Sequence, residues 1–266
     1  MSTGTNLFSL EGKVALVTGA SGYLGREMCY GFAEAGAHVL LNGRSEQKIT
    51  ALANELQGAG YSCEPAIFDV SSLSQIQGFF EGRTSQLLDI LVNNAYWGPA
   101  GSIKTSTEQD YRACLEVGFI SVHNLVQAAL PSMRRAKAVN GDASVINIAS
   151  MYGMVSPDMR IYGSPEDANP PFYGATKAAL IQWTRYAACE FGPEGIRVNS
   201  ISPGPFPSLE AQEGNKELME KITSKVPLAR LGNAEELKGP ALFLASAAST
   251  FVSGSNLVVD GGWNAW

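Results

Sequence analysis

Short apolar segments alternate with amphipathic segments along almost the whole chain. The apolar segments are nearly continuous in hydrophobic residues, which is typical of parallel strands buried on both faces. The amphipathic segments carry the spacing of apolar residues that predicts helices. The predicted strands are 13–18, 38–42, 63–68, 89–92, 144–149, 197–201 and 256–259, and the predicted helices are 23–35, 46–57, 108–135, 172–191 and 234–245.

This alternation predicts an α/β fold, a doubly wound (Rossmann) parallel sheet of about seven strands with helices on both faces. We expect residues 1–266 to form a single domain, because no linker, internal repeat or low-complexity tract interrupts the pattern. Two stretches rich in glycine and proline, 154–171 and 203–215, are interpreted as loops that lie over a site and shape substrate binding.

Composition excludes several classes of function. The net charge of −6 and the pI near 5.1 disfavour binding to nucleic acid or to an anionic membrane. The four cysteines are scattered and the chain has two histidines, which argues against a metal site or a disulfide framework and for a reducing compartment. We find neither a signal peptide nor a run of about 18 apolar residues. A cytoplasmic protein is therefore expected.

A glycine-rich turn, TGASGYLG, lies between the first predicted strand and the first predicted helix. In a Rossmann fold this turn holds a pyrophosphate against the N–H groups of a helix N-terminus. Gly19 would allow the tight turn, Gly22 the close approach of the phosphates, and Gly25 the packing of helix on strand. The alternative is a glycine-rich turn without a ligand. The predicted cofactor contacts in the turn are Gly19, Ser21, Gly22, Tyr23, Leu24 and Gly25.

The end of the second predicted strand bears on the choice between NADP and NAD. An NAD site usually has Asp or Glu here, whereas this chain has Asn42, Gly43 and Arg44. A guanidinium grips a 2′-phosphate well, so we predict NADP. NAD remains the alternative, because Asn42 can serve a ribose hydroxyl and Arg44 can be a solvated residue at a helix start.

Tyr173 and Lys177 lie four residues apart at the start of a predicted helix and so share one face. A phenol has a pKa near ~10, and a neighbouring ammonium group is expected to lower it. The pair is therefore a candidate general acid and base. The same spacing also arises by chance on helix surfaces.

Taken in order, the motifs resemble those of the short-chain dehydrogenase/reductase family over essentially the whole chain. They are TGASGYLG, Asp69-Val70, Asn93-Asn94-Ala95, Ser150, YGATK at 173–177, Ser202-Pro203-Gly204 and Asp260-Gly261-Gly262. The resemblance implies a single-domain enzyme that moves a hydride between NAD(P) and a carbonyl or hydroxyl carbon.

The resemblance also implies roles for individual residues. Tyr173 would be the acid/base, Ser150 would orient the substrate oxygen, and Lys177 would lower the pKa of Tyr173 and hold the nicotinamide ribose. The other implied cofactor contacts are Asp69 and Val70 at adenine, Asn93, Asn94 and Ala95 near the ribose, and Pro203 and Gly204 beside the nicotinamide. Each also has a purely structural interpretation; Asp69, for example, could cap the segment that follows it.

Three positions depart from the family pattern. The middle glycine of the turn is Gly22, one residue early, a spacing similar to the epimerase-like branch of the family. Tyr96 and Trp97 follow Ala95 where a glycine is common, and they could line a pocket or pack in the core. Gly118 stands where the family has a catalytic Asn at a helix kink. Because glycine tolerates irregular helix geometry, we predict an altered proton relay.

Tyr173 follows Ser150 by 23 positions, further than in most members of the family. The extra loop, 154–171, contains Arg160, Tyr162, Glu166 and Asp167, and we expect it to shape a pocket for a polar substrate such as a sugar derivative. A contact between subunits is an equal alternative for the loop. Arg160 is expected either to bind a substrate anion or to pair with a nearby acid.

The favoured function is an NAD(P)-dependent oxidoreductase that acts on a small polar alcohol or carbonyl compound. The alternatives are a nucleotide-sensing protein without catalysis and an epimerase or dehydratase that retains its cofactor. The resemblance implies a homo-oligomer, a tetramer or a dimer, with the long fourth helix, the 172–191 helix and the last strand at interfaces. The C-terminal Trp263 and Trp266 are expected to be covered there.

Overall fold

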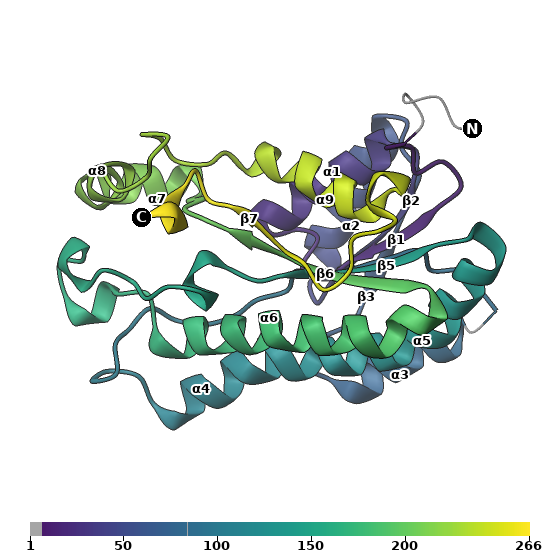
Figure 1. The fold of residues 1–266 in the computed structure, drawn as a ribbon, viewed down its shortest axis with the longest axis horizontal. Helices are drawn as coiled ribbons and strands as arrows, with labels where there is room; N and C mark the ends of the chain where they lie inside the picture. The colour runs from purple at the N-terminus through teal and green to yellow at the C-terminus, as the bar shows by residue number, and fades with distance from the viewer. Residues whose placement is uncertain (1–6, 84) are drawn as a thin grey trace.

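The computed structural model describes residues 7–83 and 85–266. Its centre is a seven-stranded parallel sheet with the strand order β3-β2-β1-β4-β5-β6-β7 (Figure 1). The strands are β1 (Val14–Val17), β2 (His38–Gly43), β3 (Cys63–Ile67), β4 (Ile90–Asn93), β5 (Ala143–Ile148), β6 (Ile196–Pro203) and β7 (Asn256–Val259). The predicted doubly wound sheet is confirmed.

Helices cover both faces of the sheet, because alternate residues of each strand point to opposite sides. On one face, α1 (Tyr23–Glu34), α2 (Glu46–Gly58) and α9 (Lys238–Ala245) pack on strand residues such as Val17. On the other face, α3 (Leu73–Glu81), α5 (Ser121–Asn140) and α6 (Pro171–Phe191) pack on strand residues such as Leu16. Figure 1 shows these two layers above and below the sheet.

The fourth predicted helix is interrupted. It consists of α4 (Glu108–Leu115), a π-helical segment (Glu116–Ile120) that contains Gly118, and α5, which continues past the predicted end at 135. Pro131 lies inside α5, and Gly141 ends the helix in the left-handed conformation. The predicted helix over 108–135 is thus irregular at Gly118, where the sequence indicated it, and its predicted end at 135 was wrong.

The same helical stretch, Glu108–Asn140, is long and apolar enough to cross a membrane by length and composition alone. This corrects the expectation that no such stretch exists. In the fold, α5 buries residues such as Leu125 and Met133 against the sheet. The stretch is thus a core helix of an α/β domain.

Several elements were not predicted. The α3 helix was missed, as were α7 (Leu209–Gly214) and α8 (Lys216–Thr223), and α7 falls inside the stretch interpreted as the 203–215 loop. Short 3₁₀ turns shape the 154–171 loop (Met159–Ile161, Pro165–Asp167) and also occur at Met151–Gly153, Gly192–Glu194, Ala234–Leu237, Ala247–Ser249 and Trp263–Ala265. Near the C-terminus, Trp263 is buried beside Met151 and Val226, whereas Trp266 is exposed.

The sheet order places the strand ends that matter for function. Since β1 pairs with both β2 and β4, the chain reverses direction of winding between β3 and β4. In open α/β sheets a ligand crevice forms at this switch point, outside the carboxyl ends of the strands. Thr18 links the carboxyl ends of β1 and β4. Its hydroxyl donates to the Val92 carbonyl and accepts from the Asn94 N–H (2.9 Å).

Candidate active site

Two adjoining cavities, of about 420 and 230 Å³, lie at the carboxyl ends of β1, β2, β4, β5 and β6. They share Gly19, Ala95 and Tyr96 as lining residues. The larger cavity is lined by the predicted residues Gly19, Gly22, Tyr23, Leu24, Gly25, Asn94, Ala95, Ser150, Tyr173, Lys177, Pro203 and Gly204. The smaller one is lined by the predicted Gly19, Ser21, Asn42, Arg44, Asp69, Val70 and Ala95.

The glycine turn packs closely against the residues that follow β4. Gly19 has φ 63°, in the left-handed region that favours glycine, and an added Cβ would lie 3.1 Å from the Cα of Ala95. A Cβ on Gly25 would lie 2.7 Å from Nδ2 of Asn94. The role predicted for Gly25 is therefore modified, since it makes room for the turn and for Asn94. The N-terminus of α1 opens into the larger cavity, as a phosphate site requires.

Asn93 and Asn42 serve the fold more than the cleft. Asn93 lines neither cavity, because it is buried at the end of β4 and its amide donates to Asn147 (2.8 Å). Asn42 borders the smaller cavity, but its amide donates to the carbonyls of Ala66 (3.0 Å) and Phe68 (3.1 Å). These bonds fix the end of β3 and engage the amide nitrogen of Asn42, and its contact with a ribose hydroxyl stays a prediction.

The smaller cavity carries positive charge. Arg44 is exposed at its rim, and Lys48, which sequence reasoning missed, lies one turn into α2 at the same cavity. Asp69 is its one lining carboxylate, and the hydroxyl and N–H of Ser71 both donate to it (2.7 and 2.9 Å). Asp69 therefore caps the following segment, as its structural interpretation predicted, and still borders the cavity.

Ser150, Tyr173 and Lys177 come together in the larger cavity. Ser150 follows β5 and accepts a hydrogen bond from the N–H of Tyr152 (3.1 Å), and its hydroxyl also hydrogen-bonds to that of Tyr173. Lys177 is almost completely buried, and its Nζ donates to the Ile148 carbonyl (2.6 Å). Pro171 at the first position of α6 starts the helix that presents both side chains.

Burial dominates the electrostatics of this group. It lowers the pKa of Lys177 to about 8, because the charged form loses its hydration. Burial likewise raises the pKa of Tyr173, and the hydrogen bond from Ser150 partly opposes that rise. Lys177 is not among the groups that shift the pKa of Tyr173 in this structure, and its effect on that pKa stays a prediction.

Tyr96 occupies the middle of the cleft. Its ring lies 4.9 Å from the ring of Tyr173, at an interplanar angle of 72°, and Nζ of Lys177 lies 5.7 Å from its centroid. The ring is half-exposed. Of the two interpretations of Tyr96 and Trp97, lining a pocket and packing in the core, the structure favours lining, because each borders a cavity.

Gly118 lies in the π-helical segment beside α6. A Cβ added there would lie 2.8 Å from the Cγ2 methyl of Thr176, next to Lys177 in the chain. The irregular geometry predicted for this position is confirmed. Thr176 occupies the space that a side chain at position 118 would need. The altered proton relay stays a prediction.

The 154–171 loop is held to the segment after α8 by an ionic cluster. Asp158 accepts two hydrogen bonds from the Arg160 guanidinium (2.9 and 2.8 Å), and its carboxylate lies 2.5 Å from Nζ of Lys225. Arg160 thus pairs with a nearby acid, the second of the two expectations for it. Glu166 and Asp167 are exposed, and Tyr162 contacts the hydroxyl of Tyr152 (3.4 Å).

Comparison with known proteins decides the family. Residues 19–264 match the family model described as "Enoyl-(Acyl carrier protein) reductase". The chain belongs to the short-chain dehydrogenase/reductase family. A rhamnolipid biosynthesis 3-oxoacyl-[acyl-carrier-protein] reductase of Pseudomonas aeruginosa is 33% identical over 263 residues, which cover 97% of this chain and 98% of the relative.

Solved structures of the short-chain dehydrogenase/reductase family superpose closely on this one. A gluconate 5-dehydrogenase from Burkholderia cenocepacia, in complex with NADP and tartrate, has a TM-score of 0.86 and 30% identity, over 99% of this chain and 100% of that one. A Pseudomonas aeruginosa RhlG/NADP active-site complex has a TM-score of 0.87 and 32% identity, over 97% and 98%. As a member of the family, the chain is an oxidoreductase that acts on hydroxyl or carbonyl groups.

Proposed function

We propose that this enzyme reduces a carbonyl group, or oxidises a secondary alcohol, with NADP as its cofactor. The observation that carries the proposal is the meeting of Ser150, Tyr173 and Lys177 in a cavity that begins at the glycine turn. The turn fits a dinucleotide, because Gly19, Gly22 and Gly25 line the cavity at the N-terminus of α1, where a pyrophosphate would meet backbone N–H groups. When bound, the cofactor supplies or accepts a hydride at C4 of its nicotinamide.

The residues of the site divide the remaining work. In reduction, the Tyr173 hydroxyl donates a proton to the carbonyl oxygen as the carbon gains hydride, and in oxidation it accepts that proton back. The Ser150 hydroxyl, which donates to Tyr173 in this structure, turns its single hydrogen to the same substrate oxygen when substrate binds. Lys177 is fixed by the Ile148 carbonyl, within reach of the ribose that the family places here.

Arg44 and Lys48 support the preference for NADP over NAD. Both are exposed cations at the smaller cavity, and Asp69, the one carboxylate there, is engaged by Ser71. A 2′-phosphate would therefore meet two cations and no free carboxylate. NADP is also bound in the solved structures of two relatives, the gluconate 5-dehydrogenase and RhlG.

For the substrate, we propose a small polar molecule with a carbonyl or secondary hydroxyl, such as a sugar derivative. Structural relatives named as gluconate dehydrogenases, one of them with tartrate, support this class. Tyr152 lies near Tyr173, and its hydroxyl is 3.4 Å from that of Tyr162 in the 154–171 loop, which brings a polar group of the loop close to the site. Residues 203–215 are proposed to form the other wall.

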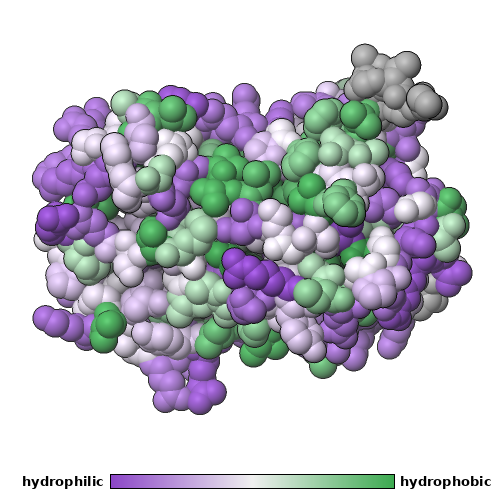
Figure 2. All heavy atoms as spheres, in the orientation of Figure 1, coloured by the Kyte–Doolittle hydropathy of each residue, from purple (hydrophilic) through white to green (hydrophobic). Residues whose placement is uncertain are grey.

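We further propose a cytoplasmic homo-oligomer, a tetramer or a dimer. β7 is an edge strand, and Figure 2 shows apolar residues gathered near it on the visible face. Phe251, just before β7, and Tyr186 on α6 are largely exposed, as expected of residues that a second subunit covers. The free thiols of all four cysteines are compatible with a reducing compartment.

The experiment that tests the function is turnover of a panel of carbonyl compounds and polyols with NADPH or NADP⁺, followed by nicotinamide absorbance. We expect Tyr173→Phe to bind NADPH as the wild type does and to lose at least a hundredfold in kcat, as removal of a general acid predicts. Unchanged turnover in this variant would contradict the mechanism. A tightly retained nicotinamide with no net redox would favour an epimerase or dehydratase.

A further inference from the structure

Two aromatic side chains line the larger cavity on either side of the residue that would hold the substrate oxygen. Tyr96 follows β4, Ser150 follows β5 and Phe206 follows β6. Because β5 lies between β4 and β6 in the sheet, Tyr96 and Phe206 flank Ser150. Neighbouring strands lie ~4.8 Å apart, so β4 and β6 lie ~10 Å apart across β5. A ligand ring packed between two walls needs two contacts of ~3.5–4 Å, which this spacing allows.

Phe206 is held in its place by a glycine. A Cβ added to Gly232 would lie 2.6, 2.7 and 2.8 Å from three atoms of the Phe206 ring, closer than van der Waals contact. The N–H of Gly232 also donates to the Pro205 carbonyl (2.9 Å), and the N–H of Gly204 donates to the Val259 carbonyl (2.9 Å). These bonds fix the backbone before the ring, and the half-buried ring packs on the core. Phe206 is therefore a preformed wall.

Tyr96 is held in the same way beyond the end of β4. A Cβ added to Gly98 would collide with the Tyr96 hydroxyl, so the glycine leaves the space that this hydroxyl occupies. The Tyr96 ring packs on the ring of Tyr173, with the centroids 4.9 Å apart. It is 41% exposed, so part of the ring stays open to the cavity that it lines. Both aromatic walls thus have their positions before a ligand binds.

The larger cavity offers little charge to a ligand. Among its lining residues, all within the described part of the chain, Lys177 is the one cation, and its Nζ donates to the Ile148 carbonyl (2.6 Å). Outside the cavity, Arg160 and Lys225 share the carboxylate of Asp158. A carboxylate on the substrate would therefore find no free cation among the residues that line this cavity.

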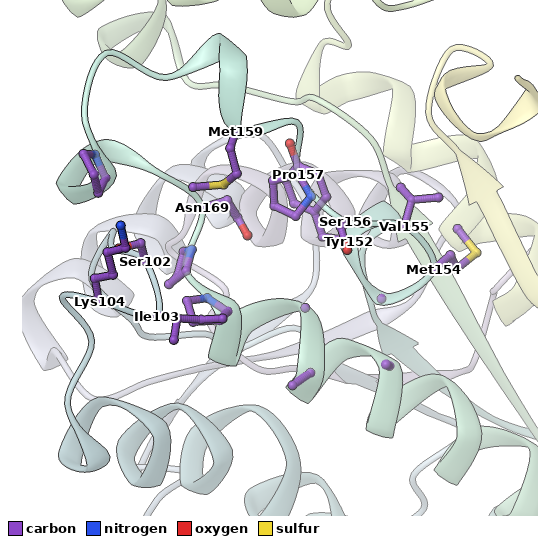
Figure 3. A pocket seen from close by; sticks show the side chains of 17 residues that line it. Ser102, Ile103, Lys104, Tyr152, Met154, Val155, Ser156, Pro157, Met159 and Asn169 are labelled. Carbon is purple, nitrogen blue, oxygen red and sulfur yellow. The ribbon is translucent and has the colours of Figure 1, made fainter.

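A separate pocket, of about 680 Å³, lies between the 154–171 loop and the first turns of α6 (Figure 3). Among the described residues, it has no lining residue in common with the larger cavity. A substrate whose oxygen meets Ser150 and Tyr173 is therefore held by the walls of the larger cavity and not by those of this pocket.

We propose that Tyr96 and Phe206 clamp the two faces of a ring in the substrate, so that the preferred substrate is an uncharged cyclic alcohol or ketone. This inference rests on the proposed oxidoreductase function and narrows its substrate class. The faces of a saturated ring present C–H groups, which the negative face of an aromatic ring attracts. Equatorial hydroxyl groups project from the edge of the ring, where they can meet Ser150 and Tyr173.

The test is calorimetric titration of the full-length protein, saturated with NADP⁺, with three ketones of six carbons. They are cyclohexanone, the open-chain 3-hexanone and the open-chain anion 5-oxohexanoate. With the oxidised cofactor a ketone cannot be reduced, so binding is measured without turnover. We expect cyclohexanone to bind the wild type at least tenfold more tightly than either open-chain ketone.

Phe206→Leu and Tyr96→Leu each remove one aromatic wall and keep an apolar side chain. We expect either variant to lower the preference for cyclohexanone over 3-hexanone at least fivefold, whereas Phe206→Tyr should keep the preference of the wild type. The matched control is Phe8→Leu, which changes an exposed phenylalanine ahead of β1 that lines neither cavity. This control should also keep the preference.

The proposal is overturned if cyclohexanone binds the wild type no more tightly than 3-hexanone, or if Phe206→Leu and Phe8→Leu show the same preference. It is also overturned if 5-oxohexanoate binds as tightly as cyclohexanone. Loss of the preference while NADPH still reduces other carbonyl compounds would refute the clamp and leave the proposed function standing. A retained preference with no turnover of any carbonyl compound would refute the function instead.

Discussion

The ring of Tyr96 stands edge-on to the ring of the catalytic Tyr173, with their centroids 4.9 Å apart. The buried Nζ of Lys177 lies 5.7 Å from each centroid. Tyr96 thus touches both catalytic side chains from a position where the family commonly has glycine. We therefore predict that it is a positioning residue for the proposed catalytic pair, since it contacts one ring and lies over one amine.

We expect Tyr96→Leu to lower kcat/KM about tenfold, because it removes an aromatic pair and a cation–π contact. Tyr96→Phe keeps both contacts and should stay close to the wild type. Steady-state kinetics of the two variants at saturating NADPH measures the difference. An equal loss of kcat/KM in Tyr96→Leu and Tyr96→Phe would instead assign the effect to the hydroxyl of Tyr96.

The pKa of Lys177 predicts how stability changes with pH. Because burial lowers this pKa from 10.5 to about 8, the unfolded chain holds the proton more tightly than the folded chain between these values. The free energy of unfolding therefore rises as the pH increases from about 8 to about 10, and the stabilisation is absent below pH 8.

Lys177→Met lacks this titration and serves as the reference. We expect it to be more stable than the wild type at pH 7, by on the order of 1–3 kcal/mol, with the gap closing toward pH 10. Urea unfolding of both proteins across this range measures the gap. A gap that does not change with pH would show that Lys177 is not the buried ammonium group described here.

Arg44→Ala tests the choice of cofactor. We expect the ratio of kcat/KM for NADPH to that for NADH to fall at least tenfold, since a charge-assisted contact to the 2′-phosphate is lost. Lys48→Ala should act in the same direction with a smaller effect. Arg112→Ala, an exposed arginine paired with Glu108 away from both cavities, is the control. An unchanged ratio in Arg44→Ala would refute its role.

Gly118→Asn probes the π-helical segment. The new side chain would meet the Thr176 methyl, and we expect a loss of stability of about 1–3 kcal/mol from overpacking. Thr176→Ser in the same chain removes that methyl and should recover most of the loss, as thermal unfolding would report. If the double variant leaves the pH–rate profile and solvent isotope effect unchanged, no proton relay runs through position 118.

The strands and the principal site could be predicted from the sequence because they rest on strong local patterns. The apolar runs that form β1 and β5 are buried on both faces, and the turn after β1 carries its glycines in order. The α3 helix was missed although its Ile76 and Phe80 are buried on one face, because it has only nine residues. A short helix such as α7 buries no residue and so leaves no apolar stripe.

The errors within the site have a common cause in tertiary contacts. The hydrogen bond from the Asn42 amide to the Ala66 carbonyl of β3 could not be predicted without knowing that β2 pairs with β3. Lys48 became a candidate only when α2 was placed beside the end of β2. The pKa of Tyr173 depends on how deeply α6 is buried, which motif spacing does not encode.

The carboxylate of Asp158 is shared between Arg160 of its own loop and Lys225 beyond α8. The 154–171 loop and the segment after α8 are therefore joined by a partly hydrated ionic link. Such links weaken as ionic strength rises. The attachment of the loop should accordingly loosen as the salt content of its surroundings rises, and residues outside both cavities of the site would govern that response.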